Sequence, residues 1–359
     1  MLRKIAVTLT VFGLIAGIGT SVSAQDAFCD EALVRGNIQR VIDEGFNQGN
    51  VAVVDELFAE NFISFPNNQD RIGFSNQIGA MRTAMPSGLT SIDHLLVEGC
   101  DAFFVRHHSG LLEGELINPG TGPIPATGTN VNIHAHVYLR FNETGQVVEE
   151  WVYSDNVSLM TQVGLMTSAV GNMPMAEASA AETITTTGNE ARNADIVRRV
   201  FEGGFNTGDT EAVRGLFAPD FMGSDVNNNP QSVDQLFGSI ATIRAALPDA
   251  MIMINDSVAQ GDYVATRVTV MGTFQNEFMS PDGQVIAPTG SPISYEASFL
   301  HRFTPEGLIA QDWVVYDQLA LQGQMGVVTP WGLDLTVVPD MGGNPGMEVI
   351  PEATMEIGP

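Results

Sequence analysis

Two aspartates, Asp155 and Asp317, have the residue type and the spacing to do acid–base chemistry. Each follows a tryptophan by four positions, in "EEWVYSDNVSLMTQVG" (149–164) and in "QDWVVYDQLALQGQMG" (311–326). A carboxylate in a largely apolar cavity has a raised pKa, which brings it toward the range in which it exchanges protons with a carbon acid or an enolate. The repeated motif therefore indicates proton-transfer chemistry wherever these side chains face a cavity.

A structural role fits the same residues. The apolar residues Leu159, Met160 and Val163 predict a short helix after Asp155. An aspartate at the position before a helix accepts hydrogen bonds from the free amides of the first turn. Capping and catalysis look alike in one dimension, so the sequence leaves both interpretations open.

Four further residues are candidates for substrate binding: Asn47, Asn206, Trp151 and Trp313. The two asparagines follow an apolar helical stripe and would orient a carbonyl group of the substrate. The two tryptophans are expected in the core or in a cavity wall rather than in the chemistry itself.

The spacing of the motifs indicates an internal duplication. The two tryptophan–aspartate motifs lie 162 residues apart, and "RVIDEGFNQGNVAVVDELFAENF" (40–62) matches "RVFEGGFNTGDTEAVRGLFAPDF" (199–221). At roughly 135–140 residues, each half is long enough to form its own core. We therefore predict two domains, 27–166 and 193–332, joined by an Ala-, Ser- and Thr-rich linker over 167–192.

Inside each half the apolar pattern changes from helical to alternating. Helical spacing predicts helices over 34–46, 51–58 and about 73–85, and the second half repeats them. Alternation in 132–141 predicts a half-buried strand, paired across a turn with 146–154. Helices first and strands after predict an α+β fold, with helices packed on one face of a curved antiparallel sheet. Such a cone has an apolar interior of the kind that binds small molecules.

The N-terminal segment predicts export, and the C-terminal segment predicts a tail. Residues 1–24 combine a basic start at Arg3 and Lys4 with a short apolar run and small residues before a cleavage point, which is typical of a secretory signal. An uncleaved N-terminal anchor is the alternative. No later apolar run approaches about 20 residues, so no membrane contact is expected after cleavage. Residues 333–359 contain four prolines and are predicted to form an extended tail. We expect a periplasmic or secreted protein.

Charge and cysteine content agree with export. The formal charge of −27 would repel nucleic acid over most of the surface, so no nucleic-acid partner is expected. Cys29 and Cys100 both lie in the first half, and an oxidising compartment permits them to pair. The sequence does not show whether their Cα atoms come within bonding range, so the disulfide is a candidate only.

The order of these motifs resembles the SnoaL-like polyketide cyclase, or ester cyclase, family of the NTF2-like superfamily, which also holds ketosteroid isomerase. The matching features are "FNQG" and "FNTG" after a helix, "LFAENF" and "LFAPDF", "ATG" and "PTG", and the tryptophan–aspartate motifs ending in "QVG" and "QMG". The resemblance covers roughly residues 30–166 and 193–328. It implies two cones that act on a small hydrophobic carbonyl compound without metal or cofactor. Asp155 and Asp317 would be the acid/base groups of an intramolecular aldol ring closure.

The sequence departs from the family at one strand. Active relatives carry "GTHxGEF" there, whereas the two halves read "GLLEGEL" and "GTFQNEF". Leu112 and Phe274 replace a polar pocket residue, which favours a binding role over the standard cyclase mechanism. Glu115 and Glu277 keep matching positions and are expected to face solvent rather than the pocket.

A surface metal site is a weaker hypothesis. His134 and His136 share one face of the predicted strand, and "RHH" adds His107 and His108. The second half lacks this histidine pair, so no metal is predicted. We expect this sheet face to pack against another cone, either within the chain or in a homo-oligomer. Two independent units on a flexible linker are the alternative.

Two functions compete on this basis. The first is an exported cyclase or isomerase that acts on a small hydrophobic carbonyl compound. The second is a non-catalytic periplasmic or secreted protein that binds such a molecule. A further arrangement keeps an open pocket in only one half, and a comparison of the two cone linings distinguishes it.

Overall fold

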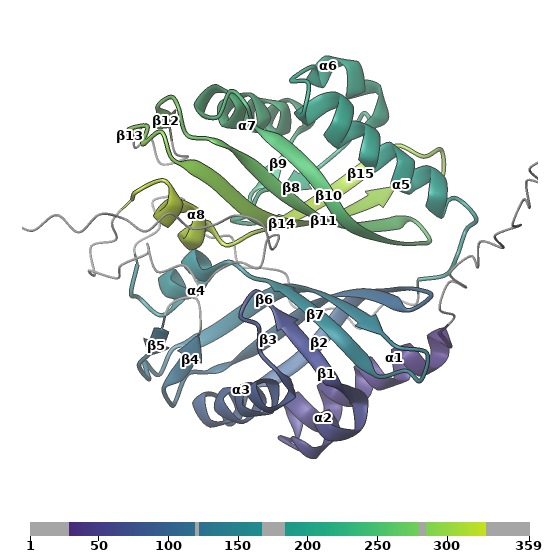
Figure 1. The fold of residues 1–359 in the computed structure, drawn as a ribbon, viewed down its shortest axis with the longest axis vertical. Coiled ribbons are helices and arrows are strands. Elements are labelled where there is room, and N and C mark those ends of the chain that lie inside the picture. Colours follow the sequence, from purple (N-terminus) through teal and green to yellow (C-terminus); the bar gives the residue numbers. More distant parts are fainter. Residues whose placement is uncertain (1–28, 119–121, 167–183, 280–284, 328–359) are drawn as a thin grey trace, which may run out of the picture.

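The chain folds into two units whose sheets face each other, as Figure 1 shows. The computed structural model describes residues 29–118, 122–166, 184–279 and 285–327. The first unit is the described part up to residue 166, and the second unit begins at residue 184. The predicted signal segment 1–24, the tail 333–359 and the linker up to residue 183 lie outside the described residues.

The first unit carries its helices early and its long strands later. In order, its elements are α1 (Glu31–Arg40), the π-helix η1 (Val41–Asn47), α2 (Ala52–Leu57), β1 (Phe58–Phe65), α3 (Arg71–Ala84), β2 (Leu89–Glu98), β3 (Asp101–Leu111), β4 (Leu116–Asn118), β5 (Gly122–Ile124), β6 (Asn130–Phe141), β7 (Val147–Tyr153) and α4 (Asn156–Gln162). The main sheet has the order β1-β7-β6-β3-β2. The sheet is mixed: β1 pairs parallel to β7, and the other neighbouring strands are antiparallel.

The second unit repeats this plan. Its elements are α5 (Glu190–Arg199), the π-helix η2 (Val200–Phe205), α6 (Thr210–Val213), the 3-10 helix η3 (Arg214–Leu216), β8 (Gly223–Ser224), β9 (Pro230–Gln231), α7 (Val233–Ala246), β10 (Met251–Gln260), β11 (Tyr263–Thr273), β12 (Phe278–Met279), β13 (Val285–Ile286), β14 (Pro292–Phe303), β15 (Ile309–Val315) and α8 (Gln318–Gln324). Its sheet has the order β10-β11-β14-β15-β8-β9. The α+β prediction with two cones is confirmed. Helix α5 begins inside the segment predicted as linker.

Helix boundaries follow local signals in the sequence. The side chains of Asp30 and Asp70 accept hydrogen bonds from first-turn amides of α1 and α3, and Ser232 forms a capping box with Gln235 at the start of α7. Gly49, in the turn after the first helical run, has a φ of 71°, which glycine adopts without a Cβ clash. None of the described helices is long and apolar enough to cross a membrane.

The alternation in β6 separates two environments. Ala135, Val137 and Leu139 pack into the core beneath the helices of the first unit. His136 and Tyr138 lie on the opposite face, where both side chains contact Ser298 of the second unit. The predicted half-buried strand is therefore buried on both faces, because the second unit covers its polar side.

Apolar and charged contacts join the two sheets. Arg140 forms an ion pair with Asp256 at 2.6 Å, and the guanidinium carbon of Arg267 lies 3.9 Å from the ring centre of Trp151. A buried apolar cluster draws on both units and includes Leu96, Phe103, Val105, Val258, Ala265 and Leu300. The two units share this cluster as a common core.

Candidate functional site

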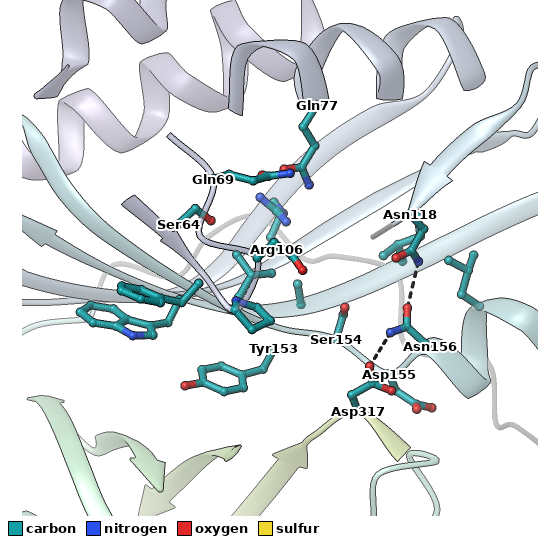
Figure 2. Close-up of a pocket in the computed structure, with 18 of the residues that line it drawn as sticks. Ser64, Gln69, Gln77, Arg106, Asn118, Tyr153, Ser154, Asp155, Asn156 and Asp317 are labelled. Atoms are coloured by element: carbon teal, nitrogen blue, oxygen red, sulfur yellow. Dashed lines mark hydrogen bonds between the residues drawn. The ribbon is translucent and has the colours of Figure 1, made fainter. Parts of the chain in front are cut away.

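A cavity of about 170 Å³ lies inside the cone of the first unit. It is bounded by α3, by the concave face of the sheet and by the segment from β7 to α4, and it reaches the second unit. Its polar lining includes Ser64, Asn67, Gln69, Gln77, Arg106, Asn118, Tyr153, Ser154, Asp155, Asn156, Glu296 and Asp317, most of which Figure 2 shows. Apolar side chains such as Met81, Ile133 and Leu159 complete the wall. A largely apolar wall with a few converging polar groups is the usual composition of a small-molecule site.

Arg106 on β3 supplies the positive charge of this cavity. Figure 2 shows its side chain directed toward Gln69 and Gln77. Its guanidinium carbon lies 5.1 Å from the ring centre of Phe46, a cation–π contact on the core side. In the part of the chain that the structure describes, the guanidinium has no hydrogen bond and no ion pair. Burial lowers the pKa of Arg106 and the nearby Glu150 opposes this, but an arginine stays charged near neutral pH.

Glu150 on β7 lies deep in the same cone and is tied to β1. Ser64 donates a hydrogen bond to its carboxylate at 2.6 Å, and burial raises the pKa of Glu150 while Arg106 and Ser64 oppose the rise. The equivalent pair in the second unit is Asp312 and Gly223. A Cβ at Gly223 would lie only 2.0 Å from Oδ1 of Asp312, so glycine is required for this close approach.

We expect Asp312→Asn to stabilise the second unit at pH 8 and to have little effect at pH 4. Asp312 is 7% exposed, and burial raises its pKa to about 7 even though the Ser224 amide donates to it. A carboxyl group whose pKa is raised by folding contributes its full stability below the pKa of the unfolded state, which is about 4. This contribution is lost as the pH rises from that value through the pKa of the folded state. The variant lacks this loss, so its unfolding free energy should exceed that of the wild type by about 1–3 kcal/mol at pH 8. Urea unfolding at both pH values measures the difference, and an equal difference at both would contradict the raised pKa.

Asp155 and Asp317 meet at the end of the cavity that borders the second unit (Figure 2). Each side chain accepts hydrogen bonds from two backbone amides at the start of α4 or α8, which confirms the capping interpretation. Asn156 donates to Asp317 at 2.6 Å, and Gln318 donates to Asp155 at 3.1 Å. Asn156 and Gln318 are equivalent residues of the two copies. Each unit therefore supports the aspartate of the other unit in the same way.

Burial and the neighbouring Asp317 carboxylate raise the pKa of Asp155 to about 7, against the lowering effect of the amides that it caps. Burial also raises the pKa of Asp317. A group that titrates near pH 7 is well matched to general acid–base catalysis at neutral pH. Because Asp155 lines the cavity while it caps α4, it is held in place by its own helix.

The cone of the second unit is filled by its own side chains. Tyr295 and Tyr316 stand where the first unit has Ile133 and Ser154, and their ring centres are 5.3 Å apart. Both tyrosines pack with the core of the second unit, and Phe299 contacts Phe201 of the π-helix η2 there. The larger aromatic side chains occupy the space that is open in the first unit.

The predicted carbonyl-orienting asparagines line neither this cavity nor the one between the units. Asn47 donates to the carbonyl of Thr90 at 2.9 Å and accepts from its amide at 2.7 Å. Asn206 makes the same two contacts with Ile252. Each asparagine ties the helical layer to an edge strand of its sheet. The carbonyl-orienting role stays a prediction without support from this geometry.

The two candidate tryptophans line cavities, whereas the two matching glutamates do not. Trp151 lines the cone cavity, and Trp313 lines a second cavity between the units. Glu115 and Glu277 are exposed and lie outside both cavities, so they face solvent as expected. The expectation that they lie in strands is wrong, because each directly precedes a short strand, β4 or β12.

The second cavity, of about 340 Å³, lies between the two units. Nδ1 of His94 lies 2.7 Å from Oδ1 of Asp93, and Nε2 of His107 lies 3.0 Å from Oδ2. Burial alone would raise the pKa of Asp93, but these hydrogen bonds outweigh it and hold the pKa well below its usual value. Burial lowers the pKa of His134 to about 3, so this ring is neutral. Among the described residues, no three His, Cys, Asp or Glu side chains are arranged to hold a metal ion.

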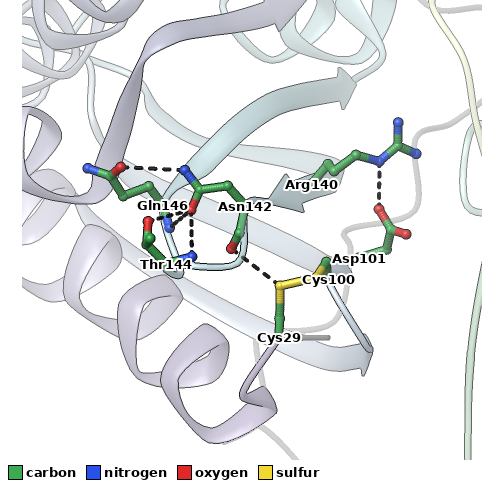
Figure 3. Close-up of a disulfide and its surroundings, with 7 residues drawn as sticks. All are labelled: Cys29, Cys100, Asp101, Arg140, Asn142, Thr144 and Gln146. Atoms are coloured by element: carbon green, nitrogen blue, oxygen red, sulfur yellow. Dashed lines mark hydrogen bonds and ion pairs between the residues drawn. A yellow bond between two sulfur atoms is a disulfide. The ribbon is translucent and has the colours of Figure 1, made fainter. Parts of the chain in front are cut away.

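Cys29 and Cys100 form a disulfide in the structure, with Cα atoms 5.0 Å apart (Figure 3). The bond ties the segment before α1 to the turn between β2 and β3. Cys29 is 1% exposed and lies 3.3 Å from the carbonyl oxygen of Asn142, in the turn between β6 and β7. The segment just before α1 is thereby attached to one end of the sheet.

The sequence analysis did not identify Arg106, the residue that supplies the positive charge in the lining of the cone cavity. The available signal is a difference between the copies, since the second unit has Val268 at the equivalent position of its strand. Ser154 against Tyr316 is a difference of the same kind. These differences become informative only when the alternation of each strand has been assigned to the inside or the outside of its cone.

The match to a family model agrees with the duplicated architecture. A family model described as SnoaL-like polyketide cyclase matches residues 36–163 and 195–325. Similar solved structures include AclR from Streptomyces galilaeus, at 24% identity over 39% of this chain and 88% of that chain, with a TM-score of 0.35. Wild-type IdmH from Streptomyces antibioticus shares 30% identity over 38% of this chain and 99% of that chain, with a TM-score of 0.34. TsrD from Streptomyces laurentii shares 20% identity over 38% of this chain and 98% of that chain, with a TM-score of 0.34. No curated protein matches the chain.

Proposed function

Because the chain belongs to the SnoaL-like polyketide cyclase family and carries the family's domain twice, we propose that its first unit is a cofactor-independent cyclase or isomerase. The second unit supports it and completes one end of its cavity. The proposed substrate is a small, largely hydrophobic carbonyl compound. We also propose, from residues 1–24, that the protein acts in the periplasm or outside the cell.

One observation carries this proposal. An open cavity in the first cone has at its end an aspartate, Asp155, whose pKa is raised to about 7. Asp317 has the same local structure, but the cone of its own unit is filled by Tyr295 and Tyr316, and its side chain instead reaches the cavity of the first unit. The duplication therefore supplies two caps of the same kind and one reaction cavity.

The proposed chemistry uses Asp155 first as a base and then as an acid. Its carboxylate removes a proton from the carbon next to the substrate carbonyl, and the electron pair of that C–H bond forms an enolate. In a cyclisation, the enolate carbon bonds to a second carbonyl carbon of the same molecule, and the resulting alkoxide takes the proton back from Asp155. In an isomerisation, the proton returns to another carbon. Both routes balance without an external reagent.

A non-catalytic binding protein is the second candidate. Leu112 and Phe274 are fully buried where active relatives carry a histidine, so neither cone has that polar group. The aspartates also have a complete structural role as caps that join the two units. In this alternative the cone cavity holds its ligand without proton transfer.

We expect Ser154→Tyr to impair function in the first cone, because it introduces the residue that stands at the equivalent position of the second cone. The assay is deuterium exchange at the carbon next to the carbonyl of propiophenone in D₂O, followed by proton NMR. The tyrosine should reduce protein-dependent exchange at least about tenfold, because the ketone can no longer approach Asp155. The matched variant Tyr316→Ser changes the filled cone and should leave exchange within about twofold.

The two candidate functions give different results in this assay. Exchange that depends on Ser154 and Asp155 supports the enzyme. Propiophenone binding without exchange supports the binding protein. Exchange that persists in Ser154→Tyr would show that the first cone is not the site of the reaction.

A further inference from the structure

Arg106 is a half-buried cation in the wall of the cone cavity, and its guanidinium has no hydrogen-bond or ion-pair partner among the described residues. Removing a charge from water is costly unless another charge or several hydrogen bonds compensate it. Phe46 contacts the guanidinium through its ring, which occupies the face of the planar group but none of its N–H donors. No hydrogen bond or ion pair in the described part of the chain engages those donors. They are free to bind a group that enters the cavity.

The acids around the cavity leave Arg106 available. Glu150 is the carboxylate that interacts electrostatically with Arg106, but it accepts a hydrogen bond from Ser64 at 2.6 Å and is not within ion-pair distance of the arginine. The other acids of the lining, Asp155, Asp317 and Glu296, belong to the end that borders the second unit. Arg106 is the one cation among the lining residues that the structure describes.

The two copies show that the cation accompanies the open cavity. The second unit has Val268 at the position of Arg106, in the cone that Tyr295 and Tyr316 fill. A valine there needs no partner and packs into the buried apolar core. The fold itself therefore does not require an arginine at this position of the strand.

We propose that the first cone binds a carbonyl compound with a single carboxylate, and that this carboxylate pairs with Arg106 while the ketone end points toward Asp155. This inference rests on the proposed function and names its substrate class. The planar guanidinium can donate two parallel hydrogen bonds to a carboxylate, which fixes both position and orientation. Gln69 and Gln77 add neutral donors and acceptors on the same side of the cavity.

Charge at the other end limits the ligand to one anionic group. Asp155, Asp317 and Glu296 would repel a second carboxylate, and the overall charge of −27 disfavours dianions everywhere on the protein. A monoanion with an apolar body fits both ends of the cavity. A cationic or fully neutral ligand would leave Arg106 uncompensated.

The experiment compares 4-oxo-4-phenylbutanoate with its neutral primary amide by isothermal titration calorimetry. The wild type should bind the carboxylate about 10–100-fold more tightly, because hydrogen bonds between charged groups are stronger than neutral ones. Arg106→Met should remove this preference, and Arg106→Lys should restore part of it, since lysine keeps the charge without the fork. Arg302→Met removes an exposed cation of the second unit and serves as the matched control, with the preference unchanged.

The outcomes separate this inference from the proposed function. Equal affinity for carboxylate and amide in the wild type, or a preference that survives in Arg106→Met, overturns the anionic substrate class. If Ser154→Tyr still prevents binding of both probes in that case, the cone remains the site. If Ser154→Tyr leaves binding of both probes unchanged, the inference and the proposed function are both wrong. Thermal melting of each variant checks that it is folded.

Discussion

Asp155→Asn should lower the rate of ketone deuterium exchange by about 10²–10⁴-fold, the usual contribution of a general acid–base group. The amide of asparagine cannot accept a proton from carbon at neutral pH. Asparagine caps helices as well as aspartate does, so α4 should keep its start. Its single side-chain oxygen cannot replace both carboxylate oxygens, which accept from two amides and from Gln318, so a small fall in melting temperature is expected. Loss of exchange in a folded protein would separate catalysis from capping at this residue. Unchanged exchange would reduce Asp155 to a cap.

The pH dependence gives this experiment a second readout. A base with a pKa of about 7 is active when deprotonated, so exchange should rise with pH up to about 7 and then level off. The Asp317 carboxylate contributes to the raised pKa of Asp155. Asp317→Asn should therefore move this rise to lower pH and leave the plateau within about tenfold. A profile identical to the wild type would show that the two carboxyl groups are not coupled.

Loss of the disulfide should reduce the stability of the first unit by about 4 kcal/mol. Cys29 and Cys100 are 71 residues apart in sequence, and a bond that closes a loop of this length restricts the unfolded chain strongly. The double variant Cys29→Ser/Cys100→Ser removes the bond without leaving a free thiol. Urea unfolding followed by circular dichroism measures the change.

Reduction of the wild type provides the matched control for this prediction. Dithiothreitol should cause the same loss as the double substitution, because both remove the same loop closure. A loss below about 1 kcal/mol in both cases would show that the covalent bond does little for stability here. A loss only in the double variant would indicate that the serines disturb the packing around Cys29.

Much of the fold could be predicted because local chemistry and periodicity determine it. The change from helical to alternating spacing placed the helices and the β6–β7 hairpin, and the "FNxG" turn matches the left-handed glycine at Gly49. The duplication then extended the prediction to the second unit. The parallel strand β1 was not predicted, because its pairing with β7 depends on the path of the chain rather than on a turn signal.

The site was harder to predict because it depends on which side chains fill space. Asn47 has a side chain that could orient a substrate carbonyl, but its amide group forms hydrogen bonds with the backbone of Thr90 instead. Arg106 could not be identified from the sequence, because only the folded structure shows that its guanidinium faces the cavity without a hydrogen bond or ion pair to a described residue. The filling of the second cone by Tyr295 and Tyr316 follows from packing across β14 and the segment after β15. The sequence pattern within one half does not show that these tyrosines fill the cone.

A crystal structure of the protein with bound 4-oxo-4-phenylbutanoate tests the central claim most directly. We predict density for one ligand in the cone of the first unit, with its carboxylate within hydrogen-bond distance of Arg106 and its ketone end toward Asp155. Tyr295 and Tyr316 should still fill the other cone. A ligand bound in the second cone or between the units, with the first cone empty, would contradict the account.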